Sequence, residues 1–444
     1  GLQVIWRSFP MLPGHYLEQY HASFAKKEDL DKLVKEKGLS TWVDLYNAMG
    51  QEDTNPLVPQ LHTWLPLTEA GAEIHVLERN PYWWAVDPEG NQLPYLDNIT
   101  HRLFETLDVF NMWIINGEID FQSRHVDIAN YTLFKESEEA GDYHLTKSIG
   151  ASHVAVQLNL TSKDPILRKF FQNRDVRFAL NMAVDREDMN DLVFDGQLMP
   201  KQYSPLKASD LWYPDQALAN LEYDPDKAND LLDPAGYADK DADGSRIDPE
   251  TKQTLSFEME GLEPAGSMYE DAMIMVADYW GRVGVKCVYE YLERSLYEER
   301  RAANEMSVGT WAADRADFPL IDPGIFIGTN DQRPWACAWG HWRNDPTDPN
   351  GEEPPEGHWI WTIWDIWDKC RVEADYEKRR RLFWDILDIW KQEIPMPTFL
   401  GEWPSWVVQK NTLHNYVEGY INSWLSHGKS FLNSSTLYWD DPEN

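Results

Sequence analysis

The sequence has no long apolar run and few cysteines, and its first residues do not resemble a signal peptide. No stretch of 18 apolar residues occurs and the mean hydropathy is −0.57, so no transmembrane helix is expected. The chain opens on GLQVIWRSFP, which lacks the pattern of a signal peptide and resembles the interior of a longer chain. Cys287, Cys337 and Cys370 lie far apart without CxxC or Cys/His metal spacing, which allows at most one disulfide.

Basic residues are also in short supply. The chain has 40 Lys and Arg against 75 Asp and Glu, a formal net charge of −35. Binding to phosphate backbones and to anionic membrane surfaces depends on clustered Lys and Arg. The balance therefore argues against nucleic acid and membrane partners and predicts a well-solvated, self-repelling surface.

Common catalytic motifs are missing as well. GxSxG, HExxH, GxGxxG and the Walker A pattern do not occur, and none of the 12 histidines lies in a recognisable nucleophile setting. A glycoside hydrolase requires only two suitably spaced carboxylates, and 75 acidic residues leave that alternative open.

Aromatic residues are abundant, with 22 Trp and 20 Tyr. Most of them must lie in the core of a chain this size. The excess also suits a cleft in which flat ligands, such as sugar rings, stack on aromatic faces.

Alternating helix and strand patterns predict an α/β fold. Residues 254–261 put Leu255, Phe257 and Met259 on one strand face, and a helix over 269–284 and a strand over 285–292 follow, which predicts parallel strands joined by a crossover helix. A strand is expected over 152–160 and amphipathic helices over 174–196, capped by Asp175, and 379–392. With 444 residues, of which 42% are hydrophobic, two or three lobes with their own cores are expected.

The stretch GTWAADRAD, residues 309–317, combines a large aromatic with a carboxylate. We expect a short buried strand over 310–313 that ends in Asp314. A Trp311 side chain at the end of this strand is expected to cover either the core or a ligand. Trp311 and Asp314 are therefore candidates for a ligand site.

Five stretches together resemble one family, the family 5 extracellular solute-binding proteins, which includes the dipeptide- and oligopeptide-binding proteins of ABC importers. The stretches are ERNPYWWAVDPEGNQLPYLDNI, NGEIDFQSR, QLNLTSKDPILRKFFQNRDVRFALNMAVDRED, YDPDKANDLLDPAGYADKDADG and WAADRADFP. Each motif is weak alone, and their order and spacing make the match specific.

The resemblance implies a periplasmic-binding-protein-like α/β fold, with two lobes around a hinge and cleft. We expect residues 1–160 to form the remaining first lobe, 161–400 the far lobe and 401–444 the return to the first lobe, with hinge crossings near Asn159 and Phe399. The family's early segments have no counterpart here. The N-terminal part of the first lobe and the inserted third lobe are therefore expected to be missing, as in a C-terminal fragment.

The function implied is capture of a small solute, an oligopeptide, between two lobes for delivery to a membrane permease of an ABC importer, without catalysis. The protein would be a periplasmic or extracellular monomer, lipid-anchored in its full-length form, and would need no cofactor. By resemblance, Asp314 pairs with the α-amino group of a peptide and Trp311 is the aromatic neighbour. Asp314 as a helix cap or surface ion-pair partner is the plainer interpretation. Asn159 either donates to the ligand or holds the hinge. Oligosaccharide binding by Trp stacking and a secreted glycoside hydrolase are the alternatives.

A second motif, DKDADGSRIDPE at 239–250, matches the spacing of a calcium loop. Asp239, Asp241, Asp243 and Glu250 are the expected ligands of a structural calcium ion, and Gly244 allows the sharp turn. Pro249 beside Glu250 and the strand after the loop do not suit a paired EF-hand. A solvated acidic turn is the alternative.

Overall fold

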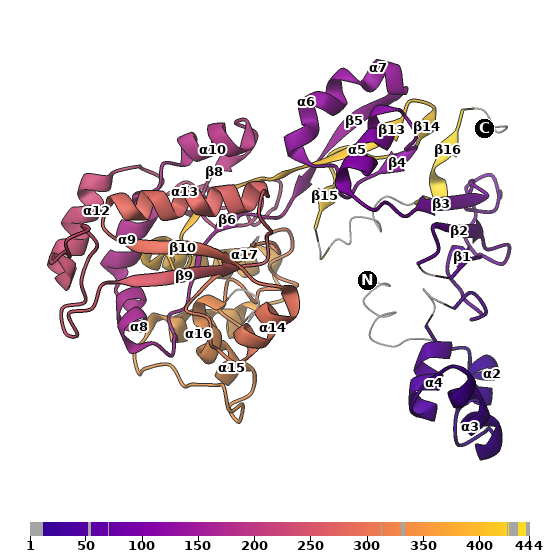
Figure 1. Cartoon of the computed structure of the whole chain (residues 1–444), viewed down its shortest axis with the longest axis horizontal. Helices are drawn as coiled ribbons and strands as arrows, with labels where there is room; N and C mark the ends of the chain where they lie inside the picture. Colours follow the sequence, from indigo (N-terminus) through magenta and orange to yellow (C-terminus); the bar gives the residue numbers. More distant parts are fainter. Residues whose placement is uncertain are drawn as a thin grey trace.

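The computed structural model describes residues 12–51, 55–69, 71–311, 313–329, 334–423, 425 and 434–440. Figure 1 shows a large α/β body on the left, a smaller sheet with helices beside it at the upper right, and a three-stranded sheet and a helical cluster on the right. We call the body around the β10-β9-β11-β7 sheet the far lobe, and the body around the β15-β5-β13-β4 sheet the first lobe.

The far-lobe sheet confirms the predicted strand–helix–strand unit. Strands β9 (Ser256–Gly261) and β10 (Lys286–Tyr291) pair in parallel and are joined by α13 (Met268–Arg282). Strand β11 (Val308–Thr310) extends the parallel sheet, and β7 (Gln157–Leu158) closes it antiparallel. Leu255, Phe257 and Met259 are all buried, because the alternating pattern places them on the same covered face.

Helices surround this sheet and share one large apolar core with it. Trp280, Trp335, Trp339 and Trp364 are fully buried there, so much of the tryptophan excess is core. The predicted helix at 379–392 is confirmed as the longer α17 (Tyr376–Glu393). The far-lobe helices are α8 (Pro165–Gln172), α9 (Arg174–Met182), α10 (Arg186–Phe194), α11 (Pro214–Ala217), α12 (Pro225–Leu232), α13, α14 (Arg294–Ala302), α15 (Cys337–Asn344), α16 (Trp359–Cys370) and α17.

The expected single helix over 174–196 is wrong, because the chain forms two helices there. Helix α9 ends at Met182, and the Asp185 carboxylate accepts the amide hydrogens of Glu187 and Asp188 to start α10. An aspartate favours this capping geometry over a place inside a helix. Asn173, and not Asp175, caps α9.

The first lobe contains a mixed sheet with helices packed against it. Strand β5 (Tyr143–Gly150) pairs along its length with β13 (Pro404–Lys410), and β4 (Phe121–Gln122) and β15 (Ile421–Asn422) flank this pair. Its core, around Phe110 and Phe134, joins the sheet to α5 (Leu107–Ile115) and α6 (Tyr131–Glu136), and the short helix α7 (Glu138–Gly141) leads into β5.

Two smaller units complete the described chain. An antiparallel sheet contains β1 (Trp64–Pro66), β2 (Ile74–Arg79) and β3 (Asn98–Arg102), and a short pair β14 (Leu413–His414) and β16 (Tyr438–Trp439) also forms. Helices α2 (Gly14–Leu17), α3 (Lys27–Glu36) and α4 (Trp42–Met49) form a cluster with its own small core. Short helical turns occur at η1 (Glu18–Tyr20), η2 (Ile128–Asn130), η3 (Asp233–Tyr237), η4 (Pro334–Ala336) and η5 (Ser434–Thr436).

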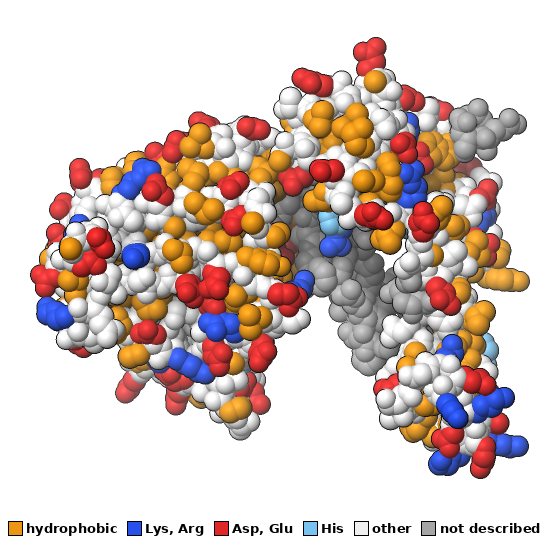
Figure 2. All heavy atoms as spheres, viewed as in Figure 1, with side chains coloured by type: hydrophobic (Ala, Val, Ile, Leu, Met, Phe, Trp, Pro, Cys, Tyr) orange, Lys and Arg blue, Asp and Glu red, His pale blue; other side chains and the backbone are white. Residues whose placement is uncertain are grey.

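The visible surface agrees with the composition. Figure 2 shows acidic side chains spread over the visible face of the far lobe, with basic groups between them. None of the helices in the described ranges has both the length and the apolar character needed to cross a bilayer.

Two strand crossings connect the lobes. The expected strand over 152–160 is split into β6 (Val154–Ala155) and β7, which lie in different sheets. Strand β6 pairs with β12 (Thr398–Gly401), which also pairs with β8 (Met199–Pro200). The segments expected to form the hinge are thus hydrogen-bonded neighbours, and the lobe boundaries at 160 and 400 stay a prediction.

The two crossings are in direct contact beyond the β6–β12 pair. The amide of Gly150 donates to the carbonyl of Trp403 at 2.7 Å. A Cβ on Gly401 would lie 2.6 Å from Cδ2 of His153 and 2.8 Å from Cδ of Lys201, so any larger residue there would have to displace these two buried side chains.

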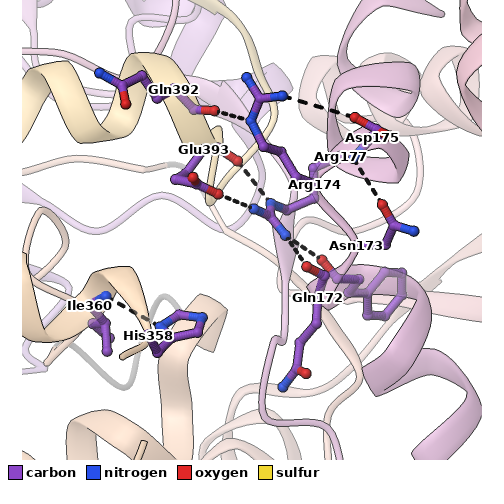
Figure 3. Close-up of polar contacts among 10 residues, drawn as sticks. Gln172, Asn173, Arg174, Asp175, Arg177, His358, Ile360, Gln392 and Glu393 are labelled. Atoms are coloured by element: carbon purple, nitrogen blue, oxygen red, sulfur yellow. Dashed lines mark hydrogen bonds and ion pairs between the residues drawn. The ribbon is translucent and has the colours of Figure 1, made fainter. Parts of the chain in front are cut away.

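A buried arginine ties the helices of the far lobe together (Figure 3). Arg177 of α9 is 1% exposed and donates to the carbonyls of Phe171 and Gln172, which end α8, at 2.9 and 2.7 Å. It also donates to the backbone and carboxylate of Glu393, at the end of α17, at 2.8 and 2.9 Å. Burial lowers the pKa of Arg177 to about 10, opposed by Glu393. This network joins α8, α9 and the end of α17 inside the far lobe.

A buried ion pair lies beside the second crossing. Lys201 follows β8, is fully buried, and donates to Glu402 at 2.8 Å and to the carbonyl of Pro205 at 3.1 Å. Glu402 joins β12 to β13 with a left-handed φ of 55°. Burial lowers the pKa of Lys201 to about 8, opposed by Glu402. Burial and the neighbouring Lys201 together hold the pKa of His153 well below its ordinary value.

We expect Glu402→Gln to destabilise the protein at pH 7 by roughly 3 kcal/mol, because it leaves the buried charge of Lys201 without its counter-charge. Chemical denaturation measures the change. Glu356→Gln, at an exposed loop position, is the matched control. Equal stability of the two variants would show that the ion pair contributes little to the fold.

Candidate ligand cleft

The parallel strands of the far lobe end at one edge of its sheet. Thr310 at the end of β11 pairs with Gly261 at the end of β9, so the chain leaves both strands side by side, through Trp311 and Leu262. Open α/β sheets commonly bind ligands at this carboxyl edge.

Trp311 lies just after its strand. The expected strand over 310–313 is wrong in its bounds, because β11 ends at Thr310; Ala312 lies outside the described residues. The indole makes an edge-to-face contact with Tyr297 at 5.7 Å between ring centroids, and the guanidinium of Arg294 lies 5.3 Å from its ring. Trp311 is partly buried and covers the small core around Tyr297.

Asp314 is held by its backbone against the hinge. The preceding residue, Ala313, donates its amide to the carbonyl of His153 at 3.3 Å, and the hydroxyl of Tyr203 donates to the carbonyl of Asp314 at 2.8 Å. The Asp314 side chain is 25% exposed and lies 3.7 Å from Nε of Arg315, which also pairs with Asp322. The carboxylate is therefore accessible to a ligand, although Arg315 already provides a positive neighbour.

Asn159 is placed inside the far lobe and not on a cleft wall. Its side chain is fully buried and donates to Asn304 and to the carbonyl of Met306, both at 2.7 Å. Its amide oxygen accepts from the backbone and hydroxyl of Thr161 at 2.9 and 2.7 Å. Both donor hydrogens are used in this network, which favours the hinge-holding interpretation over donation to a ligand.

The four residues of the calcium-loop motif do not converge. Asp241 accepts from the amides of Asp243 and Ser245, and from Thr254 at 2.7 Å, and these hydrogen bonds lower its pKa. Asp239 pairs with Lys252 at 3.2 Å and Glu250 with Lys169. Across the described ranges, no group of three His, Cys, Asp or Glu side chains is placed to hold a metal ion. The calcium site stays a prediction, and the geometry favours a self-capped acidic turn.

A cavity of about 410 Å³ lies between the two lobes. Residues 123–128, after β4, and residues 403–405 provide its first-lobe wall, and Glu263 and residues 267–269 provide its far-lobe wall. Gly150 and Ser152 of the first crossing and Asn422 of β15 complete the lining. The volume falls within the range of small-ligand sites.

The cavity carries charged groups of both signs. Burial raises the pKa of Glu263 on the far-lobe wall. On the first-lobe wall, burial and then the neighbouring Arg124 lower the pKa of His125, which favours the neutral imidazole. Tyr269 and Trp403 add aromatic surface.

A second contact joins the lobes near Asp314. The hydroxyl of Ser423, just after β15, donates to Asp317, which is almost fully buried. Burial raises the pKa of Asp317, and the like charge of Asp314 adds to this.

These groups were missed by the sequence reasoning. Glu263 had a usable signal, because it follows the end of a well-predicted parallel strand, where ligand-binding groups gather. No local sequence pattern pointed to Arg124 or Trp403 as cavity residues. They reach the cavity through pairing of β4 and β13, and these strands lie far apart in the sequence.

Comparison with known proteins decides the family. The family described as bacterial extracellular solute-binding proteins, family 5, middle part, matches residues 68–344, more than half of the chain. The chain belongs to family 5 of the bacterial extracellular solute-binding proteins. Its fold is the α/β periplasmic-binding-protein fold.

Individual relatives of this family 5 chain have different ligands in their names. A solved structure named oligopeptide-binding protein OppA is 32% identical, covers 97% of this chain and 70% of its own, and has a TM-score of 0.72. The periplasmic alpha-galactoside-binding protein of Rhizobium meliloti is 25% identical over 52% of this chain and 32% of its own length. The oligopeptide-binding protein AppA of Bacillus subtilis is 25% identical over 53% of this chain and 39% of its own length. The matched region thus spans about a third of these two curated relatives.

We expect calcium to have no effect on the melting temperature through the acidic turn at 239–250. Because Asp241 is capped by its own turn and Asp239 and Glu250 pair with lysines, a millimolar excess of calcium should leave the melting temperature where a chelator leaves it. Melting curves measure this, with magnesium as the control for divalent charge. A rise with calcium alone, abolished by Asp241→Asn, would restore the calcium-loop interpretation.

Proposed function

We propose that this family 5 protein is the substrate-binding component of an ABC importer, and that it captures a small solute, an oligopeptide, between its two lobes. The observation that carries the proposal is the cavity walled by both lobes beside a two-strand hinge. A solute held there contacts both walls, so binding stabilises a closed arrangement of the lobes.

The same proposal covers partners and location. The bound solute is delivered to a membrane permease, and the protein works as a periplasmic or extracellular monomer, lipid-anchored in its full-length form. The family description and the solute-binding relatives support this role. The proposed activity is binding without turnover, so a model glycoside should remain intact in the presence of the protein.

Peptide binding is favoured by Asp314. Its carboxylate is partly exposed at the carboxyl edge of the far-lobe sheet, outside the residues that line the cavity, and its backbone is fixed by His153 and Tyr203. A carboxylate in that position orients a ligand ammonium and leaves side chains free to vary.

An oligosaccharide is the second candidate. Tyr269 and Trp403 line the cavity beside several serines, which suits sugar rings and hydroxyl groups, and one relative is named as an alpha-galactoside-binding protein. Calorimetry and thermal-shift screening against peptide and oligosaccharide panels test the whole proposal. Binding of neither class would overturn it.

For a peptide ligand, we expect Asp314→Asn to weaken affinity by about 1.5–3 kcal/mol, the scale of one hydrogen bond to a charged group. Isothermal titration calorimetry with a peptide found in the screen measures the change. Asp230→Asn, an exposed position on α12 at the far end of the lobe, is the control (Figure 1). An unchanged dissociation constant for every peptide tested would remove Asp314 as the amine anchor.

For Trp311→Ala, we expect a loss of stability without ligand of about 2 kcal/mol, because the indole covers the core around Tyr297. Chemical denaturation of the free protein measures it. Unchanged stability together with lost oligosaccharide binding would instead assign the ring to a sugar-stacking platform.

A further inference from the structure

A second cavity, of about 730 Å³, lies where the segment that joins β2 to β3 meets the β14–β16 pair. Residues between Asp87 and Asn98 provide one wall, and Asn415, Tyr438 and Trp439 provide the other. Figure 1 places β3 and β16 at the right, on the side away from the far lobe. None of the residues that line this cavity lines the interlobe cavity, so the two are separate.

Tyr95 holds the two walls together. Its amide donates to the carbonyl of Ser435 at 3.1 Å, and its hydroxyl donates to the carboxylate of Asp87 at 2.8 Å. Its ring meets the ring of Tyr438 edge to face, with 6.4 Å between the centroids and 88° between the ring planes. Tyr95 and Tyr438 are 37% and 42% exposed. The cavity therefore contains two accessible aromatic rings at right angles to each other.

Asparagine amides lie beside these rings. Within the described part of the chain, the side chain of Asn98 makes no hydrogen bond. Asn415 donates to the carbonyl of Thr436 at 2.9 Å, and Asn91 donates to Asp87 at 2.8 Å, and neither amide oxygen has a partner among the described residues. A side-chain amide both donates and accepts hydrogen bonds, which is also what a hydroxyl group does. These amides therefore suit a ligand that carries hydroxyl groups.

The two carboxylates of the cavity already have partners. Asp87 accepts from two backbone amides, from the side chain of Asn91 and from the hydroxyl of Tyr95, at 2.8–2.9 Å. Asp97 lies 3.6 Å from the guanidinium of Arg79. None of the described residues that line the cavity is Lys, Arg or His. An anion would find no counter-charge here and a cation would find only engaged carboxylates, which favours an uncharged ligand.

We propose that this cavity is a second binding site, for an uncharged oligosaccharide. The apolar face of a pyranose ring packs on the ring of Tyr438, and the hydroxyl groups around the pyranose bond to the amides of Asn98 and Asn415. An apolar ligand would instead cover these amides and leave them without hydrogen-bond partners. Neither wall comes from the far lobe, so binding here does not require the lobes to close. The inference goes beyond the proposed function and does not depend on it.

The test follows two single tryptophans by fluorine NMR in the whole chain labelled with fluorotryptophan. The Trp439 signal reports this cavity and the Trp403 signal reports the interlobe cavity. Trp439→Phe and Trp403→Phe assign the two signals. The ligands are maltotriose, cellotriose and chitotriose, with choline and succinate as the cationic and anionic controls.

We expect an uncharged trisaccharide to shift the Trp439 signal saturably, and choline and succinate to leave it in place. Tyr438→Ala should weaken saccharide binding about 10-fold, the upper range for an aromatic contact. Asn98→Ala should weaken it about 2- to 10-fold, the range for one hydrogen bond between neutral groups. Tyr438→Phe keeps the ring and should retain binding. Tyr291→Ala and Asn47→Ala, at exposed positions outside the cavity, are the matched controls.

A folding defect is recognised separately. Loss of the β14–β16 pair in Tyr438→Ala would move the Trp439 signal before any ligand is added, and Asn98→Ala would then decide the outcome. A Trp439 signal that no saccharide moves would overturn the site. A shift that neither Tyr438→Ala nor Asn98→Ala weakens would also overturn it.

Two further results place the site. Co-sedimentation with insoluble cellulose or chitin would assign it to the chains of a polymer, and binding of the soluble trisaccharides alone would assign it to free oligosaccharides. Both results support the site. A shift of the Trp403 signal by peptides or saccharides tests the proposed function independently, so either proposal can fail while the other holds.

Discussion

The pairing of two strand crossings is the constraint on which the rest of this structure depends. Strands β6 and β12 are joined by hydrogen bonds, and the Gly150–Trp403 contact continues this pairing toward the first lobe. The side chains of His153 and Lys201 lie so close to Gly401 that no side chain fits at this position without displacing them. Because both walls of the cavity continue from these crossings, a small rotation here moves Glu263 relative to Arg124.

The sequence predicted those helices and strands whose hydrophobic pattern repeats among neighbouring residues. The β9-α13-β10 unit follows from alternating apolar residues and one amphipathic helix, and both signals are independent of distant contacts. The break between α9 and α10 was missed, because apolar residues continue through it and the preference of Asp185 for a capping position decided the outcome. The division of 152–160 between two sheets depends on pairing with β11 and β12, which local periodicity does not report.

The candidate site was less predictable than the fold, for a related reason. Asp314 and Trp311 were found through family resemblance, and the structure places both at the carboxyl edge of the parallel sheet. Asn159 follows β7 and looked equally suitable, yet its side chain faces the lobe interior and all of its hydrogen-bonding groups are used there. Residue type and position along a strand do not show which way the side chain points. The cavity itself is assembled from segments nearly 300 residues apart.

The pairing of β5 with β13 also dictates an order of events during synthesis. Ser148 and Ser405 are 257 positions apart and are bonded to each other, so the first-lobe sheet is incomplete until the whole far lobe has left the ribosome. Likewise, Arg177 in the far lobe has no counter-charge until Glu393 has been synthesised. During translation, β5 therefore exposes an unpaired edge from its own emergence from the ribosome until that of β13. A translational pause at any point between these two events lengthens the exposure of this edge by the duration of the pause.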